Sequence, residues 1–366
     1  MTKNTNGTKT IYLTLIAIAV IIVRYSTSRP NYNRGDRIKI TAIVRSEPVN
    51  YDNSQYLKLA GLKFYLPLYP GISYGDKVVV EGIVDGDKLS QPALKEIVAT
   101  KAVIYKTRSK LLEVYNRSLP TNESALVAGV TIGSKSGISS EFWESLRRSG
   151  TAHVVVASGM NVTLVAGFLL AMCLSLVKRK NAILIVILGI WIYAVICGFD
   201  APIVRAAIMG SIGFLAQLTG RLNQTIRAVI YSAFIMLFVV PDWIFDVGFI
   251  LSFTATLSLV VFTKKVKDFV EKIKLINKLP ELFKESLITT TSAQIGVIPV
   301  LYFTFGSYNP LSIAANVLTL WTIPIITIVG FIGGIFGMLY YPFGQAVLLL
   351  IYPLAKYFTG IVGFFG

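Results

Sequence analysis

Polar and ionisable side chains that interrupt long apolar stretches are the residues of this chain that could do chemistry. A first group lies in residues 149–162, where small residues surround His153, Ser158, Gly159 and Asn161. This pattern predicts a bendable helix start that lines a cavity, with Ser158 and Gly159 permitting a kink or a close helix approach. The alternative is tight packing of small residues with a histidine at the membrane interface.

Two further groups combine a carboxylate with a helix-start signal. Asp200 and Arg205 bracket Pro202 at the head of an apolar segment, and Asp246 and Gly248 lie just inside a later one. Proline suits the first turn of a helix, so Arg205 is expected about one turn inside the apolar segment. Either carboxylate could neutralise Arg205 in an ion pair; the alternative is an arginine that faces the pathway of a polyanion.

Two amides stand at similar depth in later apolar segments. Gln294 and Asn316 are each followed by a proline, at Pro299 and Pro324. Hydrogen bonding between helices is the common reason for an amide in such a place. The two prolines predict breaks or re-entrant pieces in their segments.

Hydrolytic, metal and nucleotide chemistry are poorly supported. Ser158 is not in a GxSxG elbow, and a helical offset of five residues points His153 away from it. His153 is the single histidine, so a three-histidine zinc site or a dinuclear hydrolase centre cannot be built. The run GVTIGSKSG around Gly133 lacks the glycine directly before lysine that a phosphate loop needs. We therefore expect no enzyme, no metal and no cofactor.

The elements that carry these residues are expected to lie in lipid. Of the 366 residues, 54% are hydrophobic and only 15% are charged, which excludes a soluble enzyme of ordinary composition. Thirty-five Lys and Arg against nineteen Asp and Glu give a net charge of +16. In a membrane protein such an excess indicates basic loops and a possible polyanionic ligand. The fold class is a polytopic α-helical membrane protein.

Four regions follow from the distribution of apolar residues. Residues 1–30 form a tail and an uncleaved membrane anchor around the apolar run 11–23. Residues 108–150 form amphipathic helices, and residues 151–366 a multi-span domain. The apolar segments of that domain are 152–177, 182–198, 203–218, 226–240, 244–262, 287–305, 311–340 and 346–365.

Basic residues alternate between the loops of the multi-span domain. Lysines and arginines crowd residues 178–180, 221–227 and 264–284, whereas the intervening loops near Phe199, Pro241 and Ser307 carry none. By the positive-inside rule the basic loops lie in the cytoplasm, and the segment after the amino-terminal anchor lies outside the membrane.

That external segment, residues 31–107, reads as a small all-β domain. Short alternating runs separated by glycine turns predict five or six strands, enough for a small barrel of the OB type. Aromatic platforms beside a basic groove are what single-stranded nucleic acid requires. The alternative places these aromatics in the barrel core or on the membrane surface. The candidate DNA-binding residues are Lys58, Lys63, Phe64, Tyr65, Tyr69 and Lys77.

Three strings in this order resemble the ComEC family of competence DNA-uptake channels. They are LRRSGTAHVVVASGMNV, FDAPIVRAAIM and PDWIFDVGFILSFTATLSLV, and the similarity runs from about residue 125 to residue 324. The resemblance implies a channel in the bacterial cytoplasmic membrane that passes one strand of incoming DNA during natural transformation. The positions that match the family pattern are His153, Ser158, Gly159, Asp200, Pro202, Arg205, Asp246 and Gly248.

The sequence departs from that family at two points. Relatives usually have a histidine after the Ser158-Gly159 pair where this chain has Asn161, which puts a proton-dependent role there in question. Relatives commonly continue into a metallo-β-lactamase-like domain, so the resemblance leaves two alternatives: this nuclease has been lost, or a separate polypeptide supplies it. Expected partners are single-stranded DNA, membrane lipids, an external DNA receptor and a cytoplasmic motor ATPase or helicase. The rival function is transport of a small solute or a lipid precursor, with the β domain as an adaptor.

Overall fold

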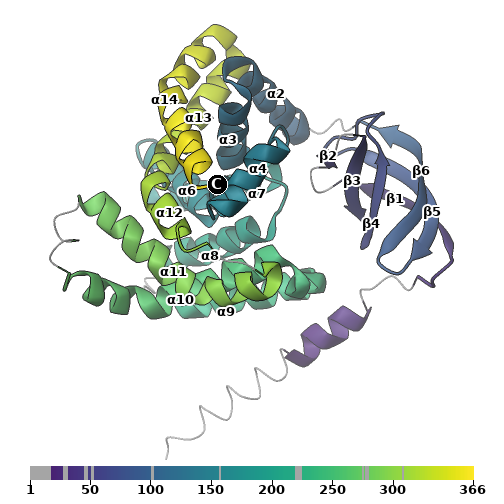
Figure 1. Ribbon diagram of the computed structural model, residues 1–366, viewed down its shortest axis with the longest axis horizontal. Helices are drawn as coiled ribbons and strands as arrows, with labels where there is room; N and C mark the ends of the chain where they lie inside the picture. Colours follow the sequence, from purple (N-terminus) through teal and green to yellow (C-terminus); the bar gives the residue numbers. More distant parts are fainter. Residues whose placement is uncertain are drawn as a thin grey trace, which may run out of the picture.

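The computed structural model places a β-sheet domain beside a bundle of helices (Figure 1). The described residues are 18–27, 32–44, 48–50, 53–99, 103–155, 158–218, 225–273, 276, 280–306 and 309–366. The polytopic helical fold with an amino-terminal β domain is confirmed. Part of the anchor (residues 11–17) and part of the basic loops (residues 221–224, 274 and 278) lie outside the described residues.

The sheet has the strand order β1-β5-β6-β4-β3-β2. Its pairings are antiparallel apart from that of β4 with β6, which is parallel. The described pairings leave β1 and β2 at the two edges, so barrel closure and the OB type stay predictions. The strands are β1 (Arg37–Ile43), β2 (Val49–Asn50), β3 (Ser54–Leu59), β4 (Leu62–Pro67), β5 (Lys77–Asp85) and β6 (Lys88–Val98).

Alternation along the strands separates an apolar core from an outer face. In β3 and β4 every second residue is buried, which places Leu57, Leu59, Phe64 and Leu66 inside with at most 5% of each exposed. A period of two is what puts successive side chains on opposite faces of a sheet. The turn between β5 and β6 contains Gly86 at φ 65°, a left-handed conformation that glycine adopts without strain.

Three helices connect the sheet to the spans: α2 (Val103–Ser118), α3 (Thr121–Ile132) and α4 (Ser140–Arg148). The amphipathic prediction is confirmed for α2, which buries Leu111 and Tyr115, and for α4, which buries Phe142 and Leu146. It is wrong for α3, because every residue from 124 to 132 is buried. The helix lies among α2, α13 and α14, so it has no face left for solvent.

In the described part of the chain, seven helical segments are long and apolar enough to cross a membrane. They are Ala152–Leu174, which comprises α5 (Ala152–Val155) and α6 (Gly159–Leu174), then α7 (Arg179–Ile196), α8 (Ala201–Leu218), α10 (Val247–Val270), α11 (Glu281–Phe305), α13 (Thr322–Leu339) and α14 (Tyr341–Phe365). The predicted segment at 226–240 forms the shorter helix α9 (Thr225–Val239), which the 3-10 turn η1 (Pro241–Phe245) follows. The chain is a multi-pass membrane protein.

Proline has opposite effects in the two segments where breaks were predicted. The segment 311–340 divides into α12 (Ser312–Thr319) and α13, and Pro324 stands in the first turn of α13, where proline fits. The break predicted near Pro299 is wrong, because α11 continues through this residue. Transmembrane helices tolerate proline where neighbouring groups satisfy the freed backbone carbonyl.

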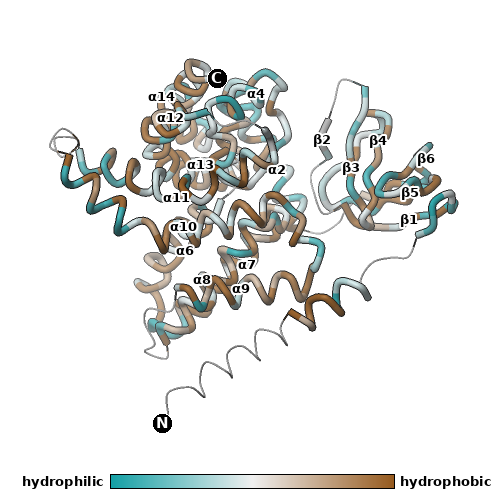
Figure 2. Tube along the Cα trace, turned by 60° about the horizontal axis from the view of Figure 1, so that its bottom comes forward, coloured by the Kyte–Doolittle hydropathy of each residue, from teal (hydrophilic) through white to brown (hydrophobic). Residues whose placement is uncertain are grey.

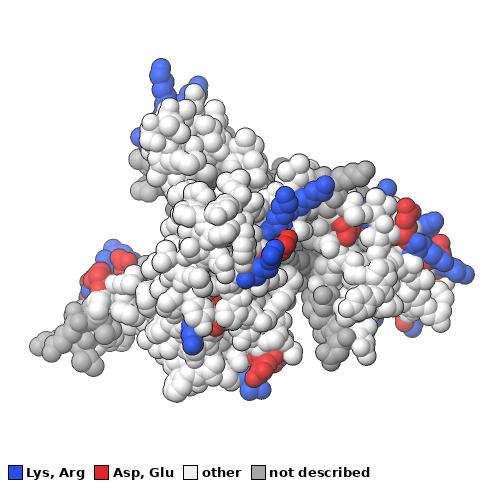
Figure 3. Space-filling model, turned by 90° about the horizontal axis from the view of Figure 1, so that it is seen from above, with Lys and Arg blue, Asp and Glu red and all other residues white. Residues whose placement is uncertain are grey.

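Charge is distributed as a membrane protein requires. Figure 2 shows hydrophobic colour along α7 to α9 and α13, with hydrophilic colour at the far end of the α10–α11 hairpin. In Figure 3 charged side chains lie over the β domain, at the ends of the helical part and in a group near the centre of the view, and broad areas of the helical part are uncharged. Broad uncharged surface on a helical bundle fits contact with a bilayer.

Glycines bring α13 close to its neighbours. A Cβ added at Gly334 would meet the Tyr115 hydroxyl at 2.5 Å, and one at Gly337 would meet Val114 at 2.4 Å. Small residues allow such approaches between membrane helices. The tightest contact is that of α14 with α13, where a Cβ on Gly344 would lie 2.2 Å from the Gly337 backbone.

We predict that Gly344→Ala separates α13 from α14, because the added methyl group meets backbone that cannot rotate away. The expected loss is about 1–3 kcal/mol in the free energy of unfolding, as for an overpacked core. Thermal unfolding of the purified protein in detergent measures it. Gly363→Ala on the same helix is the control, because a Cβ there meets no atom within 4 Å. Equal melting temperatures for the two variants would contradict the close contact.

Candidate functional site

Arg205 is half-buried where α8 packs on α6 and α10. Its Nε atom donates a hydrogen bond of 2.7 Å to the Ser252 hydroxyl on α10. Its Nη1 atom is 3.4 Å from the Met209 sulfur, and the guanidinium lies 5.9 Å from the centre of the Phe253 ring. The charge is therefore held by a hydroxyl, a thioether and a ring face.

Gly159 makes room for this guanidinium. A Cβ at Gly159 would lie 3.0 Å from Nη2 of Arg205 and 3.4 Å from the Ala206 methyl group. Any larger side chain at the start of α6 would press on the arginine. The glycine of the first sequence motif and the arginine of the second thus meet.

The two expected ion pairs of Arg205 are not formed. Asp200 lies in the turn before α8 and pairs instead with Lys135, whose Nζ is 3.3 Å from Oδ2. Asp246 is the N-cap of α10 and accepts a hydrogen bond of 2.8 Å from the Phe249 amide. Both carboxylates therefore have other partners, and within the described part of the chain no salt bridge neutralises Arg205.

The second and third motifs meet at the starts of α8 and α10. A Cβ at Gly248 would lie 3.0 Å from the Asp246 carboxylate and 3.8 Å from the Pro202 ring. The first turn of α10 therefore lies beside the first turn of α8, and a methyl group at position 248 would crowd the Asp246 carboxylate rather than Pro202. We call this group the arginine cluster: Gly159, Pro202, Arg205, Asp246, Gly248, Ser252 and Phe253.

A second polar group, the amide cluster, joins the turn before α5 to α11 and α12. Its members are Gly150, His153, Gln294, Ser312 and Asn316. Gln294 donates to the Ser312 hydroxyl at 3.2 Å, so the predicted hydrogen bond between helices is formed. Asn316 donates to the Ser312 carbonyl of its own helix at 2.8 Å. A ring nitrogen of His153 lies 3.1 Å from the Gly150 carbonyl.

Asn161 and Ser158 belong to neither cluster. Asn161 is fully buried and donates to the Val130 carbonyl on α3 at 2.8 Å. Ser158 is the extended N-cap residue of α6, at φ −111° and ψ 172°, so a helix start lies at this position as predicted. Its side chain makes no cap hydrogen bond. Residues 156–157, between His153 and Ser158, lie outside the described residues.

On the β domain, lysines and tyrosines form an outer surface of β3 and β4. Tyr56 stands opposite Tyr65, with ring centres 5.3 Å apart, and Lys58 stands opposite Lys63. We call these four residues the Tyr-Lys face. Phe64 is a correction: it is 2% exposed in the sheet core, because its neighbours on β4 take the outer positions, and it cannot stack on a base.

The remaining candidate DNA-binding residues of the β domain differ in charge and exposure. Lys63 forms a 2.8 Å ion pair with Asp87. This hydrogen bond and the charges raise the pKa of Lys63 and lower that of Asp87, so both stay charged. Tyr69 is 82% exposed, and Lys77 is exposed at the start of β5.

A contact that the sequence did not predict joins the β domain to the bundle. The Tyr74 hydroxyl donates to the Val195 carbonyl at the end of α7 at 2.9 Å. Arg108 lies 5.0 Å from the centre of the Tyr74 ring and donates to the carbonyls of Ile132 and Ile196, which end α3 and α7. Burial raises the pKa of the Tyr74 phenol, which keeps it a hydrogen-bond donor. An arginine on an amphipathic helix gives no signal of such a role.

Comparisons with known proteins agree with the sequence motifs. Residues 130–366 match the family described as Competence protein. The ComE operon protein 3 of Bacillus subtilis (strain 168) is 25% identical over 219 residues, which cover 60% of this chain. The match spans 27% of that relative's own length. No solved structure matches the chain.

We predict that Arg205→Met leaves the protein as stable or makes it more stable. A charged group inside a span costs about 2.5–3.5 kcal/mol on insertion scales, against about 1.5–3 kcal/mol for its hydrogen bond. Thermal unfolding in detergent should give an unchanged or higher melting temperature. Asp246→Ala is the contrast, since losing an N-cap costs about 0.5–2 kcal/mol. A marked loss of stability in Arg205→Met would make the arginine a structural residue.

Proposed function

Since the chain belongs to the competence protein family, we propose that it takes part in DNA uptake as a membrane channel for single-stranded DNA. The proposal deepens the family assignment in three respects: the chemistry of the path, the side on which DNA arrives, and the first surface that it meets. In this proposal the chain transports and does not catalyse.

The observation that carries the proposal is that no carboxylate among the described residues forms an ion pair with Arg205. Its charge is retained inside an apolar bundle, and its described contacts are with Ser252, Met209 and the Phe253 ring. A phosphodiester would supply the anion that the described residues do not. Guanidinium groups bind phosphate through paired hydrogen bonds, and Nη2 lies beside Gly159 at the start of α6.

The contacts of the amino-terminal region support an external β domain. Tyr74 contacts the end of α7, beside the turn near Phe199 that carries no lysine or arginine. The ring of Tyr25, in the helix Ile18–Thr27, lies 5.8 Å from the ring of Phe245 in η1, which is the other turn without lysine or arginine. Both contacts occur at the end of the bundle opposite the basic loops, and the positive-inside rule assigns that end to the outside.

The Tyr-Lys face is suited to receive the strand. It offers the exposed Tyr65 ring, beside the half-buried Tyr56, on which a base can stack, and lysine amines for phosphates. The path then continues to Arg205 and ends among the basic loops, which would attract the emerging phosphates. A motor ATPase or helicase, an external DNA receptor and a separate nuclease are the partners that this role requires.

We predict that Arg205→Gln lowers transformation frequency in a competent host by about tenfold or more, since a charge-assisted hydrogen bond is worth about 1.5–3 kcal/mol. Uptake of internally labelled DNA measures the same effect without depending on recombination. Arg117→Gln, an exposed arginine of α2 that lies 3.2 Å from Glu113, is the matched control and should remain near wild type. If Arg205→Gln accumulates in the membrane and transports normally, a phosphate path through this site is excluded.

We predict that the full chain in nanodiscs binds single-stranded DNA with an affinity that falls steeply with salt. Lys58→Gln should reduce the salt slope by roughly one charge. Tyr65→Ala should cost about 1–3 kcal/mol of binding at every salt concentration, because stacking is uncharged.

The control for this series is Lys95→Gln, whose amine already lies 3.4 Å from Glu81. Fluorescence anisotropy with labelled oligonucleotides measures all four proteins. If the affinity for single-stranded DNA changes neither with salt nor with Lys58→Gln or Tyr65→Ala, the rival function is favoured. That function is transport of a small solute or lipid precursor, with the β domain as an adaptor.

A further inference from the structure

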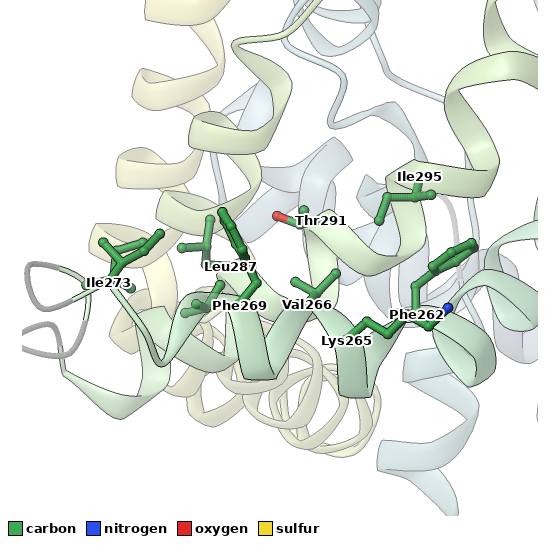
Figure 4. Close-up of a pocket in the computed structure, with 10 residues that line it drawn as sticks. Phe262, Lys265, Val266, Phe269, Ile273, Leu287, Thr291 and Ile295 are labelled. Carbon is green, nitrogen blue, oxygen red and sulfur yellow. The ribbon is translucent and has the colours of Figure 1, made fainter.

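The α10–α11 hairpin contains an apolar groove near its charged end (Figure 4). The groove has a volume of about 420 Å³, within the range of roughly 300–1,000 Å³ that ligand sites occupy. Its lining is apolar apart from Lys265 and Thr291. The residues that the argument uses are Phe262, Lys265, Val266, Phe269, Leu287 and Ile295.

This groove crosses the level at which each helix changes from uncharged to charged. On α10, residues 247–263 carry no charge and Lys264 and Lys265 follow. On α11, Glu281, Lys284 and Glu285 precede an uncharged stretch, residues 286–305. Phe262, Leu287 and Ile295 therefore line the groove on the uncharged side, and Lys265 stands at the boundary.

The length of α10 puts this boundary at the edge of the bilayer. Residues 247–263 are seventeen residues, which span about 26 Å at 1.5 Å per residue. The hydrocarbon core of a bilayer is about 30 Å thick. Lys265 is therefore expected at the level of the lipid headgroups, with the Phe262 end of the groove open to the acyl chains.

The lysines at the boundary differ from the other lysines of the hairpin. Lys267 lies 3.9 Å from Glu271, and Lys284 lies 4.0 Å from Glu281. Among the described residues, Lys264 and Lys265 form no salt bridge, and the contact of the Lys265 amine is the Phe262 ring at 5.8 Å. An amine beside an apolar groove complements a ligand with an anionic head and a long apolar tail.

We propose that this groove binds an anionic phospholipid, with one acyl chain along Phe262, Leu287 and Ile295 and the phosphate on Lys265. Basic sites between membrane helices at the cytoplasmic face bind such headgroups in other proteins. The lipid would fill the apolar space between the ends of α10 and α11 and tie the basic end of the hairpin to the membrane surface.

Native mass spectrometry of the full chain, released from detergent with added phosphatidylglycerol or phosphatidylcholine, tests the proposal. The wild type should retain phosphatidylglycerol in preference. Lys265→Gln should weaken that retention about fivefold, the effect expected for one lysine at an anionic surface, and Lys265→Arg should preserve it. Lys267→Gln is the control, because that amine has a partner and is not part of the groove lining.

A second pair of variants tests whether the acyl chain of the lipid occupies the groove. Leu287→Trp should fill the groove and reduce retention of phosphatidylglycerol, whereas Leu282→Trp, an exposed leucine of the same helix that does not line the groove, should not. Glycerol phosphate, which has no tail, should not compete.

Three results would overturn the proposal. They are equal retention of the two lipids by the wild type, equal effects of Lys265→Gln and Lys267→Gln, and competition by glycerol phosphate. If Leu287→Trp retains lipid but loses a cytoplasmic protein in a pull-down, the groove is a protein-docking site and the lipid proposal fails.

Discussion

A guanidinium without a carboxylate partner in the described bundle is the constraint on which the arrangement of the spans depends. The Arg205 guanidinium needs a hydrogen-bond acceptor, and α10 supplies the Ser252 hydroxyl. It needs room, and α6 begins with Gly159 at that point. It also needs α10 to start close to α8, and Gly248 in the first turn of α10 lies beside Pro202 in the first turn of α8. Three helices thus meet around one charge whose burial is unfavourable, as in a site kept for a ligand rather than for stability.

Glycines on α13 and the Tyr74–Arg108 contact hold the rest of the molecule in place. The close approach of α13 and α14 buries α3 on all sides, and Arg108 ends α3 and α7 with hydrogen bonds to their last carbonyls. Because Tyr74 lies on Arg108, the β domain is joined to the bundle beside the turn that leads into α8.

The sequence predicted the spans, the β domain and the break before Pro324, because these follow from apolar length, period-two alternation and proline geometry. It did not predict the burial of α3, since twelve residues with serine and threonine read as a surface helix until the facing glycines are placed. It left open whether Arg205 is neutralised, and distance decided this: Asp200 meets Lys135 and Asp246 caps its own helix. The alternation also left the side of Phe64 open, because register alone fixes which face is buried.

The central claim, that a positive charge at position 205 acts on the strand in transit, is tested most directly by restoring that charge chemically. Cys173 and Cys197, both buried, would first be replaced by alanine, and Arg205→Cys introduced. Uptake should then be lost. Modification of the introduced thiol with a cationic methanethiosulfonate should restore uptake, while a neutral reagent of the same size should not. Equal rescue by both reagents, or full uptake before modification, would contradict the claim.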